Sequence, residues 1–201
     1  MLKIVTAPNS VLSDIAKPIS KVGTSVIMVI EEMKKTLAKT TDPKGVGLAA
    51  PQVGKALRLF IAKPTDKSEP MVFINPEIIE KSSKVDYVKR PARRSQGVGG
   101  PKKNPSASSG QKAFKKLEGC LSLPTIWGAV LRPSFLTLSY LDEQGKSHKQ
   151  KFSGFMATII QHEIDHLNGI LFPKIVLSQK GKLYKSHKDE KGEDVFEEIN
   201  L

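Results

Sequence analysis

A chain of 201 residues, of which 39% are hydrophobic and 26% charged, can bury one sizeable core and has the composition of a globular protein. No apolar run approaches the roughly 18 residues of a membrane-spanning helix, and the N-terminal segment lacks the apolar centre and cleavage site of a secretory signal. We therefore expect one domain over residues 1–201, located in the cytoplasm, with no membrane partner. The single cysteine excludes an internal disulfide.

The net charge of +12 is concentrated in one segment of the chain. Residues 81–116 hold eleven Lys or Arg and one acidic residue, so this segment carries +10 and the other 165 residues carry +2. The segment is rich in Pro, Gly and Ser and poor in large apolar groups, so burial cannot offset the entropy lost on ordering it. We predict a long, flexible, basic insertion at 81–116.

Apolar residues at helical spacing predict an amphipathic helix over residues 24–40 and a second helix over residues 152–168, which Gly169 would end. A Gly- and Ala-rich loop is expected at 45–54, and the Lys- and Glu-rich tail from 183 is expected at the solvated surface. Strands are predicted at 57–61, 71–76, 129–131 and 135–141. The fold class predicted is α+β, with antiparallel strands packed around the second helix and the N-terminal helix at one side.

The second predicted helix carries the pattern H-E-x-x-H at residues 162–166. Residues four apart lie on one helix face, so His162 and His166 can bind one metal ion, and the adjacent Glu163 can take a proton from a water on that ion. A polar surface helix that matches by chance is the alternative. The apolar neighbours of the motif argue against it, because they indicate a buried helix, in which unpaired His and Glu would be costly. These neighbours are Phe155, Ile159, Ile160, Ile164 and Leu167.

A catalytic metal site of this kind usually has a third protein ligand. Some metallopeptidases supply a His six residues after the second His, but Phe172 stands at that position. His148 and His187 lie in polar, Lys-flanked stretches. Cys120, between Gly and apolar residues, is the better candidate, because a thiolate binds divalent cations firmly. A lone cysteine is otherwise more often a buried apolar side chain.

Three motifs together resemble those of peptide deformylases, in the order in which that family carries them: Gly45–Gln52 (GVGLAAPQ), Glu118–Ser122 (EGCLS) and Gln161–His166 (QHEIDH). Arg132, Tyr140 and the stretch 142–145 also resemble the family's segment between the second and third motifs. The similarity runs from the start of the chain to about Phe172, apart from residues 81–116, which a much shorter link replaces in the family.

This resemblance implies a hydrolase that removes the formyl group from the N-terminal formyl-methionine of newly made polypeptides, by attack of metal-bound water on the formyl carbon. It implies one divalent metal ion held by Cys120, His162 and His166: Fe²⁺ in the native form, with Zn²⁺ or Ni²⁺ as replacements. Glu163 would be the general base. Gln52 and the backbone N–H of Leu121 would stabilise the oxyanion, although a loop Gln that bonds nearby backbone is the alternative for Gln52.

The resemblance also implies substrate contacts. Gly45, Gly47 and Gly119 would let an extended peptide lie close to the protein backbone. Simple turn geometry is the alternative explanation for Gly45 and Gly47. The methionine side chain would lie among apolar residues that could equally be plain core: Val46, Phe155 and Ile159. Glu118 and Arg132 could form an ion pair beside the ligands, or a surface pair of little consequence.

Three roles stay open for residues 81–116: a solvated insertion, an arm that contacts ribosomal RNA through phosphates, or a partial cover of the active-site mouth. The partners expected are nascent formyl-methionyl polypeptides and the ribosome. Two rival functions are a metallopeptidase with another substrate class, and an inactive relative that binds RNA. The first requires a downstream third ligand, where Phe172 stands, and the second requires a lost ligand or a lost Glu163.

Overall fold

The computed structural model describes residues 1–87 and 117–200 of the chain. In these ranges the helices are α1 (Thr24–Ala38), α2 (Gly154–Leu167) and α3 (Phe172–Ser178), with short 3₁₀ helices at Ser10–Leu12 and Ala50–Val53. The strands, in chain order, are β1 (Gly47–Ala49), β2 (Leu59–Ala62), β3 (Met71–Lys81), β4 (Val85–Tyr87), β5 (Glu118–Cys120), β6 (Leu123–Gly128), β7 (Leu131–Pro133), β8 (Phe135–Leu141), β9 (Ser147–Ser153), β10 (Leu183–Lys188) and β11 (Asp194–Glu198).

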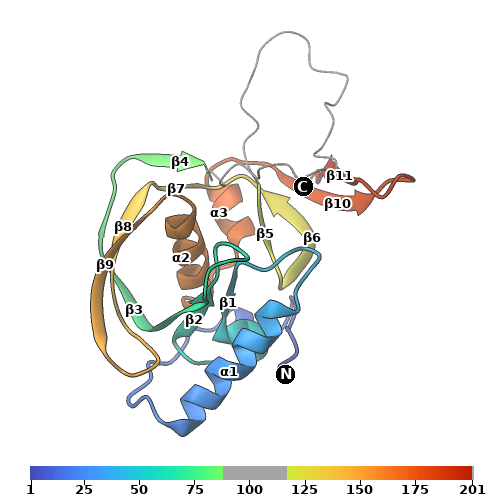
Figure 1. Ribbon diagram of the computed structural model, residues 1–201. Coiled ribbons are helices and arrows are strands. Elements are labelled where there is room, and N and C mark those ends of the chain that lie inside the picture. The colour runs from blue at the N-terminus through green and yellow to red at the C-terminus, as the bar shows by residue number, and fades with distance from the viewer. Residues whose placement is uncertain (88–116, 201) are drawn as a thin grey trace.

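The strands form three antiparallel sheets in the described part of the chain. Five strands pair in the order β1-β2-β3-β8-β9, four in the order β11-β10-β6-β5, and β4 pairs with β7. Figure 1 shows α2 between β8–β9 on one side and β5–β6 on the other, with α1 outside the five-stranded sheet. Antiparallel sheets with separate helices make this the predicted α+β class.

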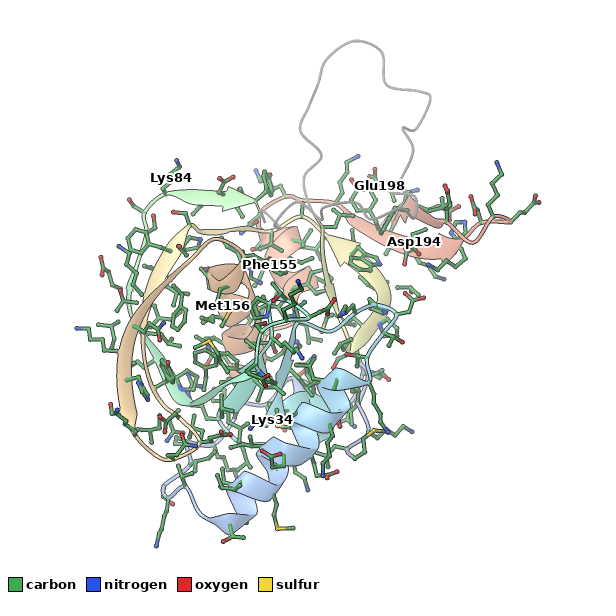
Figure 2. All side chains as sticks on the ribbon, in the orientation of Figure 1. Lys34, Lys84, Phe155, Met156, Asp194 and Glu198 are labelled. Carbon is green, nitrogen blue, oxygen red and sulfur yellow. The ribbon has the colours of Figure 1, made fainter. Side chains whose placement is uncertain are left out.

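Strands β1 and β2 of the five-stranded sheet are buried on both faces, because side chains alternate along each strand and each face packs on a hydrophobic cluster. On β2, Phe60 and Ala62 point into the cluster that holds the apolar face of α2, while Leu59 and Ile61 point into the cluster that holds α1. The α2 side of the sheet is packed with aromatic rings: Phe60, Phe73, Tyr140 and Phe152. Figure 2 shows side chains filling the space between α2 and the five-stranded sheet, with Met156 of α2 labelled among them. The helix that carries H-E-x-x-H therefore has a rigid support.

Helix α2 ends where the sequence predicts, because Gly169 adopts φ +68°, a conformation that glycine reaches without strain. The Ile170 N–H donates to the Asp165 carbonyl at 2.8 Å, which closes the last turn. A Cβ at Gly169 would also lie 2.3 Å from the Ser13 carbonyl oxygen. The glycine thus ends the helix and allows the N-terminal segment to pack against it.

The prediction of a structureless insertion over 81–116 is wrong for its first residues. Strand β3 continues to Lys81, the Ser82 N–H donates to the Phe135 carbonyl at 3.0 Å, and Val85–Tyr87 forms β4. Two register shifts of β3 against β8, one between Ile74 and Glu77 and one between Ile78 and Glu80, disrupt the alternation of buried and exposed residues, so the two-residue pattern is lost. The remainder of the predicted insertion, 88–116, lies outside the described residues.

The C-terminal part of the chain differs from the sequence prediction in four elements. Strand β9 was not predicted, and it contains Phe152, which was expected to begin the second helix; α2 begins at Gly154 instead. The strand predicted at 129–131 is instead the junction of two strands, β6, which ends at Gly128, and β7, which begins at Leu131. Phe172 begins α3, which was not predicted. The tail is a β10–β11 hairpin that extends the β5–β6 sheet, although most of its side chains are exposed as expected. No helix in the described ranges is both long and apolar enough to cross a bilayer.

Candidate metal centre

Helix α2 presents both histidines of the motif to one point. His162 and His166 are one turn apart, with ring centroids 5.1 Å from each other. The Nδ1 of His162 lies 3.1 Å from Glu118 Oε2, so this nitrogen is occupied by a carboxylate and the opposite ring nitrogen, Nε2, is left for a ligand. Burial lowers the pKa of His166 well below its ordinary value, which favours the neutral imidazole that binds metals.

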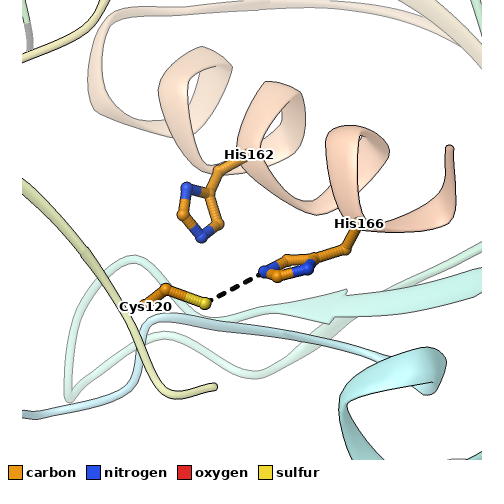
Figure 3. Close-up of side chains that lie close together, drawn as sticks. All are labelled: Cys120, His162 and His166. Carbon is orange, nitrogen blue, oxygen red and sulfur yellow. Dashed lines mark hydrogen bonds between the residues drawn. The ribbon is translucent and has the colours of Figure 1, made fainter. Parts of the chain in front are cut away.

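Strand β5 brings Cys120 to the same point. Its Sγ lies 3.1 Å from His166 Nε2, and the thiol is buried (Figure 3). One ligand atom from each of Cys120, His162 and His166 lies within 4.8 Å of the others. Ligand atoms on one ion at bond lengths of about 2.0–2.3 Å are about 3–4 Å apart, so these residues fit a single divalent metal ion. One soft thiolate and two imidazoles suit zinc, iron or nickel.

Phe172 has a packing role at the position where some metallopeptidases place a third His. The side chain is 1% exposed, and its ring stacks on His162 with centroids 6.0 Å apart. His148 pairs with Asp142 on the five-stranded sheet, and His187 lies on the exposed hairpin. Neither belongs to the group that converges on Cys120.

Glu118 and Arg132 form a buried pair, so the alternative of a surface pair is wrong. Arg132 donates to both carboxylate oxygens of Glu118, at 2.7 and 2.9 Å, and to Asp165 of α2 at 2.8 Å. Burial alone would raise the pKa of Glu118, but the charge of Arg132 and hydrogen bonds from His162 and Arg132 lower it to about 2. Arg132 therefore holds an ionised Glu118, which in turn orients His162.

Glu163 is buried beside the ligands. Its side chain is 4% exposed, and Oε2 has no hydrogen-bond partner among the described residues. Burial raises the pKa of Glu163 to about 7, against the opposing charges of His162 and Arg132. A carboxyl group with this pKa can both accept and release a proton near neutral pH.

The side chain of Gln52 makes a local backbone contact and also reaches Cys120. Its Oε1 accepts a hydrogen bond from the Ala49 N–H at 2.8 Å, which is the local backbone contact. This bond directs Nε2 toward Ser122 Oγ at 3.3 Å and Cys120 Sγ at 3.5 Å. The amide donor is thereby fixed beside the metal ligands. Leu121 follows Cys120 in the chain, between β5 and β6.

The predicted site residues meet around one cavity. With the exception of His166, which lies against Cys120, all of them line it: Gly45, Val46, Gly47, Gln52, Gly119, Cys120, Leu121, Phe155, Ile159, His162 and Glu163. Phe155 stands on the first turn of α2 (Figure 2). Apolar side chains and convergent polar groups in one cavity are typical of a substrate site.

The three glycines of the cavity are required by neighbouring side chains and not by turn geometry, since none has a left-handed φ. A Cβ at Gly47 would lie 2.2 Å from Glu163 Oε1, one at Gly119 would lie 2.7 Å from the Trp127 ring, and one at Gly45 would lie 2.4 Å from Thr40 Oγ1. Each absent side chain leaves space for a specific neighbour.

Sequence reasoning missed several residues of the cavity: Pro43, Lys44, Leu117, Trp127 and Thr158. It also missed the contact of Asp165 with Arg132. Trp127 had one signal, as the single tryptophan of the chain and seven residues after Cys120. The others belong to no recognisable motif, because their positions depend on how distant segments pack.

The sequence of this chain is similar to those of known peptide deformylases. The polypeptide deformylase family profile matches residues 1–91 and 92–182. The peptide deformylase of Prochlorococcus marinus (strain NATL2A) is 36% identical over 203 residues, covering 99% of this chain and 85% of that protein. The Borreliella burgdorferi peptide deformylase is 34% identical, covering 95% and 98%.

Solved structures that resemble this fold are also peptide deformylases. The peptide deformylase of Thermotoga maritima superposes with a TM-score of 0.67 at 29% identity, covering 87% of this chain and 97% of that one. That of Legionella pneumophila gives a TM-score of 0.66 at 33% identity, covering 87% and 85%. With its cavity, its ligand group and these relatives, the chain belongs to the polypeptide deformylase family.

Proposed function

We propose that this chain, as a single catalytic domain over residues 1–201, removes the formyl group from the N-terminal formyl-methionine of newly made polypeptides. Family membership makes it a hydrolase that acts on an amide. The observation that carries the proposal is the convergence of Cys120, His162 and His166 beside the buried carboxylate of Glu163. That arrangement can hold a metal ion and move a proton at one point of the cavity.

Cys120, His162 and His166 would hold one divalent metal ion, Fe²⁺ in the native form with Zn²⁺ or Ni²⁺ as replacements. When bound, the ion would supply Lewis-acid activation of the water that attacks the formyl carbon. The fit rests on three donor atoms of suitable chemistry within 4.8 Å. The contact between His162 Nδ1 and Glu118 supports the same ligand set, because it leaves the other nitrogen for the ion.

Glu163 is proposed to accept the proton of the attacking water and to deliver it to the departing amine. A pKa of about 7 suits both steps, since the free energy of either protonation state is similar near neutral pH. Its unpartnered Oε2 is available for that proton. Gln52 Nε2 and the backbone N–H of Leu121 are proposed to donate to the developing oxyanion. The loss of one such donor typically costs about 10²–10³ in rate.

The methionine side chain is proposed to lie among Val46, Phe155 and Ile159, which line the cavity on the side of α2 and the segment before β1. A second set of lining residues, Gly45, Gly47 and Gly119, is proposed to lie along the peptide backbone. Their missing Cβ atoms make room for neighbouring side chains, and a peptide that pairs with their main chain would bind as an added strand.

The test is anaerobic purification, metal analysis and measurement of formate release from formyl-methionyl tripeptides. Cys120→Ala is expected to lose both metal and activity. Glu163→Ala is expected to keep the metal and lose about 10²–10⁴ in kcat, whereas Glu77→Ala, the same change at an exposed position of β3, is expected to match the unsubstituted protein. No formate release by the native protein would refute the function, and full metal content in Cys120→Ala would refute the ligand set.

Contact with the ribosome is a second proposal and rests on charge. Residues 81–116 carry +10, which suits phosphate contacts without sequence reading. Lys81 and Lys84, at the start of this segment, are exposed. Replacing the lysines at 102, 103, 112, 115 and 116 by Gln is expected to weaken salt-dependent ribosome binding while formate release from free peptides stays unchanged. Unchanged ribosome affinity would refute this proposal.

A further inference from the structure

Trp127 forms part of the wall of the active-site cavity and has no part in the chemistry proposed above. It lies on β6, half-buried, and lines the cavity together with Cys120 and Glu163. Its ring covers Gly119, since a Cβ there would lie 2.7 Å from the indole. The indole therefore packs on the backbone of the residue next to Cys120.

The C-terminal hairpin holds this indole from behind. The Trp127 Nε1–H donates to Ser186 Oγ on β10 at 2.9 Å. The Phe196 ring on β11 packs edge-on against the indole, with centroids 5.7 Å apart and planes at 83°. The register accounts for both contacts: Tyr184 is opposite Trp127, Ser186 is two residues further along β10, and Phe196 is opposite Ser186. All four side chains therefore lie on one face of the sheet.

Burial alone does not explain this arrangement. Phe196 is 43% exposed, and Leu183 is the buried core residue that the hairpin supplies within the described chain. A half-exposed aromatic pair with a side-chain hydrogen bond contributes little to a core, but it restricts the rotamer and tilt of an indole. In this protein the restricted indole is a wall of the substrate cavity.

We propose that the β10–β11 hairpin positions Trp127 as a contact surface for the peptide substrate. Ser186 and Phe196 are the positioning residues. The flat, apolar indole face would pack against an apolar side chain of the peptide beyond the formyl-methionine, because the methionine pocket lies on the α2 side of the cavity. This inference rests on the proposed function, and it adds the C-terminal hairpin to the parts of the chain that determine substrate binding.

The single tryptophan makes the test direct, because fluorescence excited at a wavelength where the three tyrosines do not absorb comes from Trp127 alone. In Phe196→Ala, emission is expected to shift to the red and acrylamide quenching to increase in folded protein. The KM for a formyl-methionyl tripeptide with an apolar second residue is expected to rise about twofold to tenfold, with kcat within about twofold. In Ser186→Ala, the emission and the KM are expected to change in the same direction. In Phe196→Tyr, which keeps the ring, both are expected to equal those of the native protein.

Val195→Ala is the matched control, because Val195 is apolar and lies on the same strand but points to the other face. Emission and KM in Phe196→Ala equal to those in Val195→Ala would overturn the proposal. So would a lower melting temperature without any change in KM, since that is the result of a hairpin that only stabilises the fold.

Titration of Trp127 fluorescence with the unformylated methionyl tripeptide separates this inference from the proposed function. If the native protein released no formate, the proposed function would fail, yet the titration would still report peptide contact. Fluorescence that responds to the peptide in native protein and responds more weakly in Phe196→Ala supports the inference. The absence of any response in native protein would overturn it.

Discussion

Gly47 determines where the proposed general base can lie. It belongs to β1, packed under α2, and its missing side chain leaves the space that Glu163 Oε1 occupies. Under the proposed function, the absence of a side chain at Gly47 allows Glu163 to take its position in the cavity. Glycine at this position is explained by the position of a neighbouring carboxylate rather than by its own backbone conformation.

Gly47→Ala is expected to lower kcat for formate release by about 10²-fold, because a catalytic group displaced by about 1 Å can lose that much. The added Cβ would lie 2.2 Å from Glu163 Oε1, so the carboxylate must move. Gly23→Ala is the control, since a Cβ there meets no atom within 4 Å. Equal kcat values for the two variants would contradict the explanation.

The acid sensitivity of the fold is expected to depend in part on Glu118. Its pKa is lowered from an ordinary value of 4.5 to about 2 in the folded protein. A lowered pKa means that the carboxylate stabilises the fold fully above pH 4.5, and that this contribution is lost as the pH falls from 4.5 toward 2.

Urea unfolding of metal-free protein at pH 7, 5, 4 and 3 provides the measurement. The difference in unfolding free energy between the native chain and Glu118→Gln is expected to be largest at pH 7 and 5 and to shrink at pH 4 and 3. If the unfolding free energies of the native chain and of Glu118→Gln fell in parallel as the pH was lowered, Glu118 would not have the lowered pKa.

At the scale of secondary-structure elements, Arg132 joins three of them. It lies on β7 and binds Glu118 of β5 and Asp165 of α2, with 6% of its own side chain exposed. Strand β5 and helix α2 carry the three proposed ligands, so the charge network fixes the strand with Cys120 against the helix with both histidines. Burial alone would lower the pKa of Arg132, but the carboxylates of Glu118 and Asp165 raise it, so the guanidinium stays charged.

Arg132→Met is expected to destabilise the metal-free protein by about 3–5 kcal/mol, because it leaves Glu118 buried without its partner. Urea unfolding at pH 7 measures this change. Lys182→Met removes an exposed pair with Glu198 on the hairpin and is expected to have no measurable effect. Equal effects of the two substitutions would show that burial of the Arg132 network does not contribute.

At the scale of the whole molecule, the ligand group links its two main sheets. Cys120 belongs to the four-stranded sheet, whereas His162 and His166 belong to the helix that packs on the five-stranded sheet. A metal ion held by all three would connect the two halves of the fold. Its binding free energy would then add to the stability of the whole domain.

Removal of metal by a chelator is expected to lower the melting temperature by about 5–10 °C, and added Zn²⁺ or Ni²⁺ to restore it, because a ligand at about 100 times its Kd adds about 2.7 kcal/mol. Calorimetry with and without the ion measures this. Cys120→Ala, which lacks one ligand, is expected to show a much smaller response. The same shift in Cys120→Ala would place the ion elsewhere.

The sequence by itself determined the local features of this protein. The four-residue spacing of His162 and His166 places both on one helix face, and the burial of Ile30, Met33 and Leu37 follows the helical period of α1. The fold class and the proposed ligand set follow from such patterns and from the resemblance of three motifs. These features depend on residues close together in the chain, so a local pattern is enough to predict them.

Only the tertiary structure decided the contacts between distant segments. The bidentate contact of Arg132 with Glu118 spans 14 residues, and that of Trp127 with Ser186 spans 59. Strand β4 and the part of β3 beyond residue 76 also escaped prediction; in β3, register shifts against β8 break the alternation on which a sequence pattern relies. Packing of separate elements sets these contacts, and no short-range period in the sequence encodes it.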